Sequence, residues 1–337
     1  MSIFEEKEVF GDFKHSFESI ENSGFRYGNL QLVGHGKVAN DKCGTWHIVG
    51  CQSYDLHGRF GIGLDGVDYR KKVFVKRIPH SCNKPSCPIC YPLWSWREGG
   101  SIDFRLKEAS RQFAESGLVY PEVEHFIVSP SPREYGLSCE NSWKNAFEAM
   151  RVRGIVGGVA IQHAFRFNKL TRRWVFGIHW HVLGYSIEKY RCRGCKKVCQ
   201  PSCMGFENLT REWNKRDGFI VKIASSWEHR KSIRSTAAYQ LSHSSIDISK
   251  KYYRVARWFG CASYRRLKIT PEVKKAWEES KKSVCPCCKH ELVPLRYFGR
   301  DARFFADDFP RKGLWMDAFE DGQFVWAEDT RESWRRG

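Results

Sequence analysis

Hydrophobic and polar positions alternate along several short stretches between residues 120 and 260, the pattern of half-buried β-strands. Strands are predicted at "VEHFIVSPSP" (123–132), "IVGGVAIQHAFRF" (155–167), "WVFGIHWHVLGY" (174–185), "GFIVKIAS" (218–225) and "KYYRVARWFG" (251–260). Helical spacing instead marks "REGGSIDFRLKEASRQFAESG" (97–117), "CENSWKNAFEAMRVRG" (139–154) and "SIRSTAAYQLSHSS" (232–245). The order of these elements predicts an α+β fold with helices packed on an antiparallel β-sheet.

The net charge of the chain indicates which class of partner it binds. The 337 residues include 56 Lys and Arg against 38 Asp and Glu, a formal net charge of +18. So basic a chain favours a polyanionic partner, with nucleic acid as the default. The chain has neither an apolar run of membrane-spanning length nor the apolar segment of a signal peptide. We therefore expect no membrane partner and a cytoplasmic location.

The stretch 174–185 carries His179 and His181 at alternate positions, so a strand would place both imidazoles on one face. Strand geometry puts their Cβ atoms about 7 Å apart, close enough to bind one cation. The opposite face is apolar, and we expect it to face the core: Trp174, Phe176, Ile178, Trp180 and Val182.

A third ligand should come from the neighbouring strand. If the hairpin turns at Thr171, His163 lies opposite His179 and shares its face. A register shift of one residue would place Gln162 there instead. We expect His163, because imidazole is the better ligand for a transition metal. A lone histidine on an apolar strand is usually only buried, but three on one face favour a metal site.

The helix predicted at 232–245 offers a nucleophile. Tyr239 and His243 are i,i+4 neighbours, so a phenol and an imidazole can approach each other. A phenol has a pKa near 10 and needs a base or a cation to become nucleophilic. His243 could be that base or could complete the metal's ligand set. The helix should turn Ile233, Ala237, Ala238 and Leu241 to the core, and Ser232, Ser235, Tyr239 and His243 away from it.

Taken together, these motifs resemble the HUH-type nucleases, specifically the rolling-circle replication initiators of archaeal plasmids and viruses. "HWHV" (179–182) matches the family's histidine–hydrophobic–histidine signature, and "HFIVSPSP" (125–132) lies where its first strand motif belongs. "STAAYQLSH" (235–243) matches the helix with the nucleophilic tyrosine. The resemblance covers residues 120–260, in the family's order, and implies a ferredoxin- or RRM-like antiparallel sheet flanked by helices.

In such enzymes the tyrosine attacks a phosphodiester of single-stranded DNA at the origin. It becomes linked to the 5′-phosphate and frees a 3′-hydroxyl for the host polymerase. The resemblance therefore implies that Tyr239 is the nucleophile and that His179, His181 and His163 hold Mg²⁺ or Mn²⁺.

The chain departs from the family at two positions. Ser242 stands where many relatives have a lysine, and His243 stands where others have a second tyrosine. A single-tyrosine mechanism follows, which leaves open how a replication cycle ends. No P-loop motif is present, so strand separation would fall to a host helicase. Alternatives are a relaxase or single-tyrosine transposase of the same superfamily, and a non-catalytic zinc-bearing DNA-binding regulator.

The 14 cysteines indicate metal sites rather than disulfides, because no export signal is present. One zinc is expected at Cys82, Cys87 and Cys90, with His80, Cys43 or Cys51 as fourth ligand. Two C-x2-C pairs, Cys192 with Cys195 and Cys285 with Cys288, suggest a zinc ribbon; alternatively, Cys192, Cys195, Cys199 and Cys203 bind a zinc by themselves. Such closed four-ligand sites are structural.

These motifs suggest three segments. Residues 1–118 would form an N-terminal zinc-bearing module with a linking helix, and residues 119–270 the nuclease domain with a Cys-rich insertion at 190–205. Residues 271–337 would hold a zinc-knuckle segment and a charged C-terminal tail.

Two further stretches, 163–174 and 250–268, interleave cations with aromatic residues. Cations can follow a nucleic-acid backbone while aromatic rings stack on unpaired bases. We expect DNA contacts from Arg166, Lys169, Arg172, Arg173, Arg254, Arg257, Arg265 and Arg266.

Overall fold

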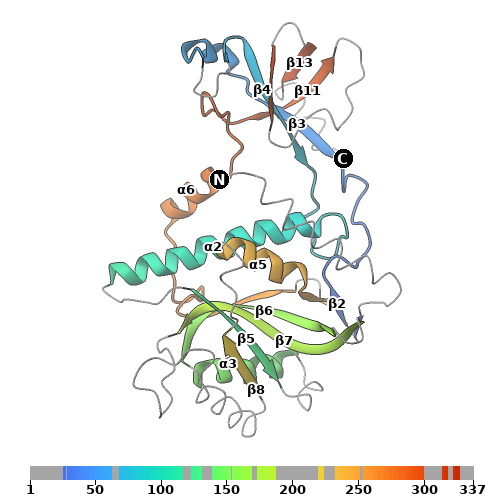
Figure 1. Cartoon of the computed structure of the whole chain (residues 1–337), viewed down its shortest axis with the longest axis vertical. Coiled ribbons are helices and arrows are strands. Elements are labelled where there is room, and N and C mark those ends of the chain that lie inside the picture. Colours follow the sequence, from blue (N-terminus) through green and yellow to red (C-terminus); the bar gives the residue numbers. More distant parts are fainter. Residues whose placement is uncertain are drawn as a thin grey trace. The chain divides into compact units, whose positions relative to one another are not determined.

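The structure, a computed structural model, is mixed α+β with antiparallel sheets (Figure 1). One compact unit contains Asn40–Cys82 and Thr270–Gly337, and a second contains Ser2–Ala39 and Asn83–Ile269. None of the helices within the described ranges combines the length and hydrophobicity that a bilayer crossing needs. The structure describes residues 26–27, 29–62, 68–116, 123–130, 139–152, 154–168, 173–186, 219–223, 232–250, 253–299, 313–317 and 322–326.

This division differs from the predicted segments. The boundary near residue 270 agrees, but residues 40–82 join the C-terminal segment, and the helix α2 (Tyr91–Glu115) belongs to the second unit. The cause is strand pairing between distant segments: β3 (Trp46–Gly50) pairs with β11 (Val293–Gly299). The local composition of these segments does not predict such a pairing.

The second unit is built on a five-stranded antiparallel sheet of order β10-β6-β7-β5-β8. Its long central hairpin joins β6 and β7, as the alternating pattern predicts. The strand bounds are β5 Glu124–Pro130, β6 Ile155–Asn168, β7 Arg173–Ser186, β8 Phe219–Ile223 and β10 Ala256–Gly260.

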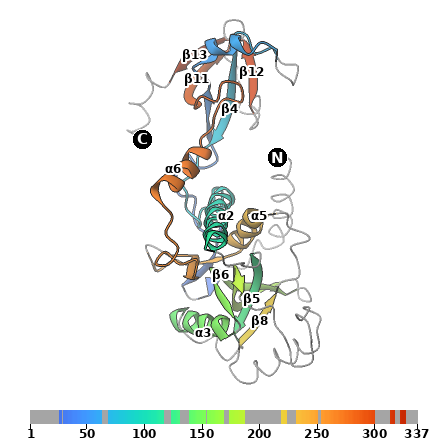
Figure 2. The same ribbon diagram turned by 90° about the vertical axis from the view of Figure 1, so that its left-hand side faces the viewer.

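Helices cover both faces of this sheet (Figures 1 and 2). On one face α3 (Cys139–Val152) packs on a core that includes Trp180 and Val182, as predicted. The other face is buried as well, because Leu183 and Tyr185 join the core under α2 and α5 (Ile233–Ser242). The expectation of a single core face on β7 was therefore incomplete.

A small three-stranded sheet, β1-β2-β9, completes the second unit. Its last strand follows directly after α5, and the side chains of Leu30 and Leu32 pack against Ala164 and Phe165 of β6. The bounds are β1 Arg26–Tyr27, β2 Leu30–Leu32 and β9 Ser245–Asp247.

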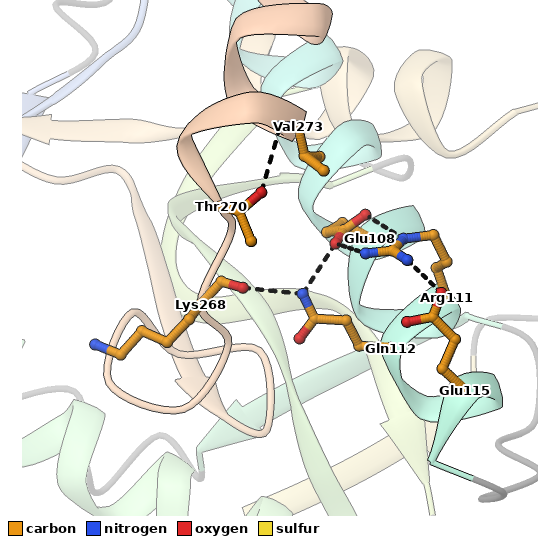
Figure 3. A network of polar contacts seen from close by, with 7 residues as sticks. All are labelled: Glu108, Arg111, Gln112, Glu115, Lys268, Thr270 and Val273. Atoms are coloured by element: carbon orange, nitrogen blue, oxygen red, sulfur yellow. Dashed lines mark hydrogen bonds and ion pairs between the residues drawn. The ribbon is translucent and has the colours of Figure 1, made fainter.

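The first unit holds another five-stranded antiparallel sheet, of order β12-β4-β3-β11-β13. A 3-10 helix, η2 (Tyr54–Arg59), and α6 (Pro271–Ser280) accompany it. The Thr270 hydroxyl caps α6 by accepting a hydrogen bond from the Val273 backbone N–H (Figure 3). The remaining strands are β4 Lys72–Pro79, β12 Leu314–Asp317 and β13 Gly322–Trp326.

Candidate metal centres and nucleophile helix

Three histidines of the β6–β7 hairpin converge on one face of the sheet. His163 pairs with His179 in the register that the sequence predicts, and His181 follows two residues later. One ligand nitrogen from each of the three lies within 4.8 Å of the others. Gln162, the alternative third ligand, is engaged elsewhere, since its Oε1 accepts a hydrogen bond of 2.5 Å from the Tyr253 hydroxyl.

Hydrogen bonds to backbone carbonyls orient two of these rings. His179 Nδ1 donates to the Gly177 carbonyl at 2.8 Å, and His163 donates to the Gln240 carbonyl of α5. His163 Nε2 is then left buried with no hydrogen-bond partner among the described residues. A buried polar atom without a partner is costly, and a bound cation would satisfy it. The three-histidine group therefore fits a divalent metal ion.

Electrostatics keeps two of the three imidazoles neutral, as metal ligands must be. Burial, together with the nearby Arg166 guanidinium, lowers the pKa of His179 to about 3. Burial also holds the pKa of His163 well below its usual range, with added repulsion from His179 and His243. The nitrogen lone pairs are thus available at neutral pH.

A fourth histidine, which the sequence analysis missed, supports the group from the neighbouring strand. His125 of β5 is buried, and its Nε2 lies 2.9 Å from His181 Nδ1. A ligand histidine whose second nitrogen is hydrogen-bonded keeps its ring orientation and tautomer. His125 opens the predicted "HFIVSPSP" motif, but only the strand order β6-β7-β5 brings it beside His181.

We predict that His125→Leu lowers the affinity of the three-histidine group for Mn²⁺ about 10- to 100-fold, because His181 loses its orienting hydrogen bond. Isothermal titration of the folded protein with Mn²⁺ measures the effect. His290→Leu, at an exposed histidine, is the matched control and should bind as wild type. Equal affinity of His125→Leu and wild type would contradict a supporting role.

The helix α5 carries Tyr239 and His243 beside this group. Their ring centroids are 4.6 Å apart, Tyr239 is 36% exposed and His243 only 7% exposed. His243 Nδ1 lies 3.0 Å from the Tyr239 carbonyl, and His243 is near enough to His163 to depress its pKa. The Tyr239 ring thus packs against the His243 imidazole, and His243 in turn lies close to the three-histidine group.

His243 corrects one expectation. The helical spacing placed it on the side away from the core, whereas it is buried. The reason is tertiary: this side of α5 is buried as well, since Thr236 and Gln240 are each 2% exposed and His243 lies near His163 of β6. Ala237, Ala238 and Leu241 are buried as predicted.

The predicted first zinc group divides between the two compact units. Cys43 and Cys82 belong to the unit with residues 40–82, and Cys87 and Cys90 belong to the unit with residues 83–269. The group therefore stays a prediction from the cysteine spacing. His80, another candidate for its fourth ligand, packs its ring on His47, with centroids 4.8 Å apart.

A second group consists of Cys51, His57, Cys285 and Cys288 and could also hold zinc. His57 is fully buried, and its Nε2 lies 3.3 Å from both Cys285 Sγ and Cys288 Sγ and 3.4 Å from Cys51 Sγ. His57 Nδ1 donates to the Lys72 carbonyl at 2.8 Å, which fixes the ring for ligation. A hydrogen bond from Cys51 lowers the pKa of the Cys285 thiol, favouring the thiolate that zinc requires.

This second group differs from the predicted zinc ribbon. Cys285 and Cys288 are ligand candidates as expected, and among the described residues they group with Cys51 and His57. The signal for His57 was weak, because one histidine in a Gly-rich stretch has no knuckle spacing. The predicted residues Cys192, Cys195, Cys199 and Cys203 lie outside the described residues.

The predicted DNA-contacting cations lie in different environments. Arg166 is half-buried and donates to the Gly177 carbonyl and the Ser129 hydroxyl, so it is an internal cation beside the histidines. Arg257 lies over the Trp143 ring at 5.5 Å. Arg254, Arg265 and Arg266 are exposed. Lys169 and Arg172 lie outside the described residues, as does the side chain of Arg173.

Comparisons of the chain with protein-family models, with curated proteins and with solved structures find no match.

Proposed function

We propose that this protein is an HUH-type endonuclease and strand transferase that nicks and rejoins single-stranded DNA to initiate rolling-circle replication. One observation carries the proposal: three imidazoles with ligand atoms within 4.8 Å of one another adjoin the helix that bears Tyr239 and ends at His243. The antiparallel sheet with helices on both faces is compatible with the ferredoxin- or RRM-like fold that the motifs imply. The basic composition suits a DNA substrate.

His163, His179 and His181 would hold the catalytic ion. Imidazole ligands favour Mn²⁺ over Mg²⁺, because Mg²⁺ prefers oxygen and dehydrates reluctantly. The bound ion would polarise the scissile phosphate and neutralise charge in the transition state. Arg166, beside His179, adds fixed positive charge to the same region.

Tyr239 would supply the nucleophile. Its phenolic oxygen forms a bond to phosphorus as the bond from phosphorus to the 3′-oxygen breaks, which gives a 5′-phosphotyrosine link and a free 3′-hydroxyl. His243 would accept the phenol proton, and the departing 3′-oxygen takes up a proton. One phosphodiester replaces another, so the reverse reaction rejoins strands without an external energy source.

The substrate would be single-stranded DNA at a replication origin in the cytoplasm, with host polymerase and helicase acting downstream. A relaxase or single-tyrosine transposase would share this chemistry. A zinc-bearing DNA-binding regulator would bind DNA and form no covalent link.

Incubation with a labelled random-sequence pool of single-stranded DNA tests the proposal. In Mn²⁺ we expect an adduct that survives heating in detergent and is released by phosphodiesterase. EDTA should prevent it, and a duplex pool should give little, because the nick site must be unpaired. Absence of an adduct in both Mn²⁺ and Mg²⁺, with DNA binding intact, would favour the regulator.

A further inference from the structure

The loop that follows β10, residues 261–268, is held in place by α2. Arg105 is 7% exposed and donates to the carbonyls of Ala262 at 2.9 Å and Leu267 at 3.1 Å, near the two ends of the loop. Gln112, about two helical turns further along the same face of α2, donates to the Lys268 carbonyl at 2.9 Å (Figure 3). The loop backbone is therefore fixed before any ligand arrives.

The entry to the loop also depends on its sequence. Gly260 has a φ of +57°, and a Cβ at this position would lie 1.9 Å from the Val156 carbonyl. Only glycine can make this turn without displacing β6. The backbone N–H of Cys261 then donates to the Val156 carbonyl at 3.0 Å, which ties the loop to the sheet.

The loop presents a flat aromatic side chain to solvent. The Arg105 guanidinium lies 4.2 Å from the centre of the Tyr264 ring, yet the tyrosine remains 61% exposed. Because Arg105 covers one face of the ring, the exposed area belongs to the other face and the edge. The exposed face is therefore rigidly backed and available to a flat ligand.

Cations and a hollow adjoin this ring. Arg265 and Arg266 follow it in sequence, and neither forms an ion pair with any residue of the described ranges. Both help to line a cavity of about 460 Å³ whose other walls include Arg151, Phe147, Ile155 and Val156. Such a hollow combines apolar surface, on which a nucleobase can lie, with positive charge for its phosphate.

We propose that the 261–268 loop and this hollow form a platform for unpaired DNA, in which one base stacks on Tyr264 and the next enters the hollow. Arg265 and Arg266 would contact the intervening phosphates. Stacking needs an exposed base face, which a duplex hides, so the aromatic–cation arrangement selects single strands. Seven residues of β6, about 23 Å of extended β-strand, separate Val156 at the hollow from His163.

The identity of the ligand as DNA rests on the proposed function, but binding can be measured without the chemistry. Fluorescence anisotropy with an oligodeoxythymidine measures binding alone when EDTA removes the metal ion and Tyr239→Phe removes the proposed nucleophile. Tyr264→Ala should weaken binding about tenfold, whereas Tyr264→Phe should retain it, because the ring and not the hydroxyl stacks. An oligonucleotide with abasic sites should bind weakly and respond little to Tyr264→Ala.

The contribution of Arg265 and Arg266 is measured separately, by the salt dependence of binding. The double substitution Arg265→Ala with Arg266→Ala should reduce the dependence of log Kd on log salt by about 0.7 per lost phosphate contact. Lys274→Ala with Lys275→Ala in α6 changes the net charge equally and serves as the control.

Equal binding by Tyr264→Ala and Tyr264→Phe would overturn the platform, as would a duplex that binds as tightly as the single strand. Tighter binding of the matching RNA would make RNA the occupant and overturn the assignment to DNA. Weaker binding by Tyr264→Ala would support the platform even if the wild type forms no covalent adduct. Failure of the platform and failure of the nuclease proposal are therefore distinguishable.

Discussion

Tyr239→Phe is expected to abolish the covalent protein–DNA adduct while single-stranded DNA binding stays close to wild type. The substitution removes only the phenolic oxygen, and the ring keeps its contact with His243, whose centroid lies 4.6 Å away. Removing a nucleophile lowers the rate roughly 10³-fold or more, since binding and metal coordination cannot replace bond formation. Gel separation of adducts and anisotropy on the same DNA pool measure the two quantities.

Tyr54→Phe is the matched control, because this half-buried tyrosine lies in η2 and belongs to the other compact unit. Its adduct yield should equal that of the wild type. An undiminished adduct in Tyr239→Phe would remove the assigned nucleophile. Loss of DNA binding together with the adduct would mean that Tyr239 contributes to substrate binding rather than to chemistry.

Cys285→Ser is expected to remove one equivalent of zinc and to unfold the unit that contains residues 40–82 and 270–337. A structural zinc site contributes about 10–16 kcal/mol of apparent binding free energy, against about 5–15 kcal/mol for the net stability of a domain. Cys285 and Cys288 meet Cys51 and His57 across more than 200 residues of chain, so the ion would hold the two segments of the unit together. Metal analysis and hydrogen exchange of β3, β4 and β11 provide the measurements.

The sequence "CPCCK" supplies a control inside the same turn. Cys287 is half-buried between the two ligand candidates but is not a member of the group, so Cys287→Ser should keep both the zinc and the protection of the strands. Cys192→Ser distinguishes the observed group from the predicted ribbon, because it should leave this zinc in place. Loss of this zinc in Cys192→Ser, or its retention in Cys285→Ser, would contradict the Cys51–His57–Cys285–Cys288 site.

The sequence by itself determined the central hairpin and its histidine face. Side chains alternate with a period of two in a strand, so His179 and His181 had to share a face. A turn midway between His163 and His179 then fixed the pairing that the structure has. These relations are local, and neither the strand order nor the packing of helices could alter them. The same holds for α5, whose helical period put Ala237 and Leu241 in the core.

Only the tertiary structure decided which distant groups meet. His125 reaches His181 because β5 is the neighbour of β7, and nothing in the spacing of residues 125 and 181 encodes that order. Arg105 supports Tyr264 from a helix that lies more than 150 residues earlier in the chain. Cys51 and His57 join Cys285 and Cys288 for the same reason: pairing across a long loop depends on the whole fold, whereas periodicity and knuckle spacing report only on neighbours in the chain.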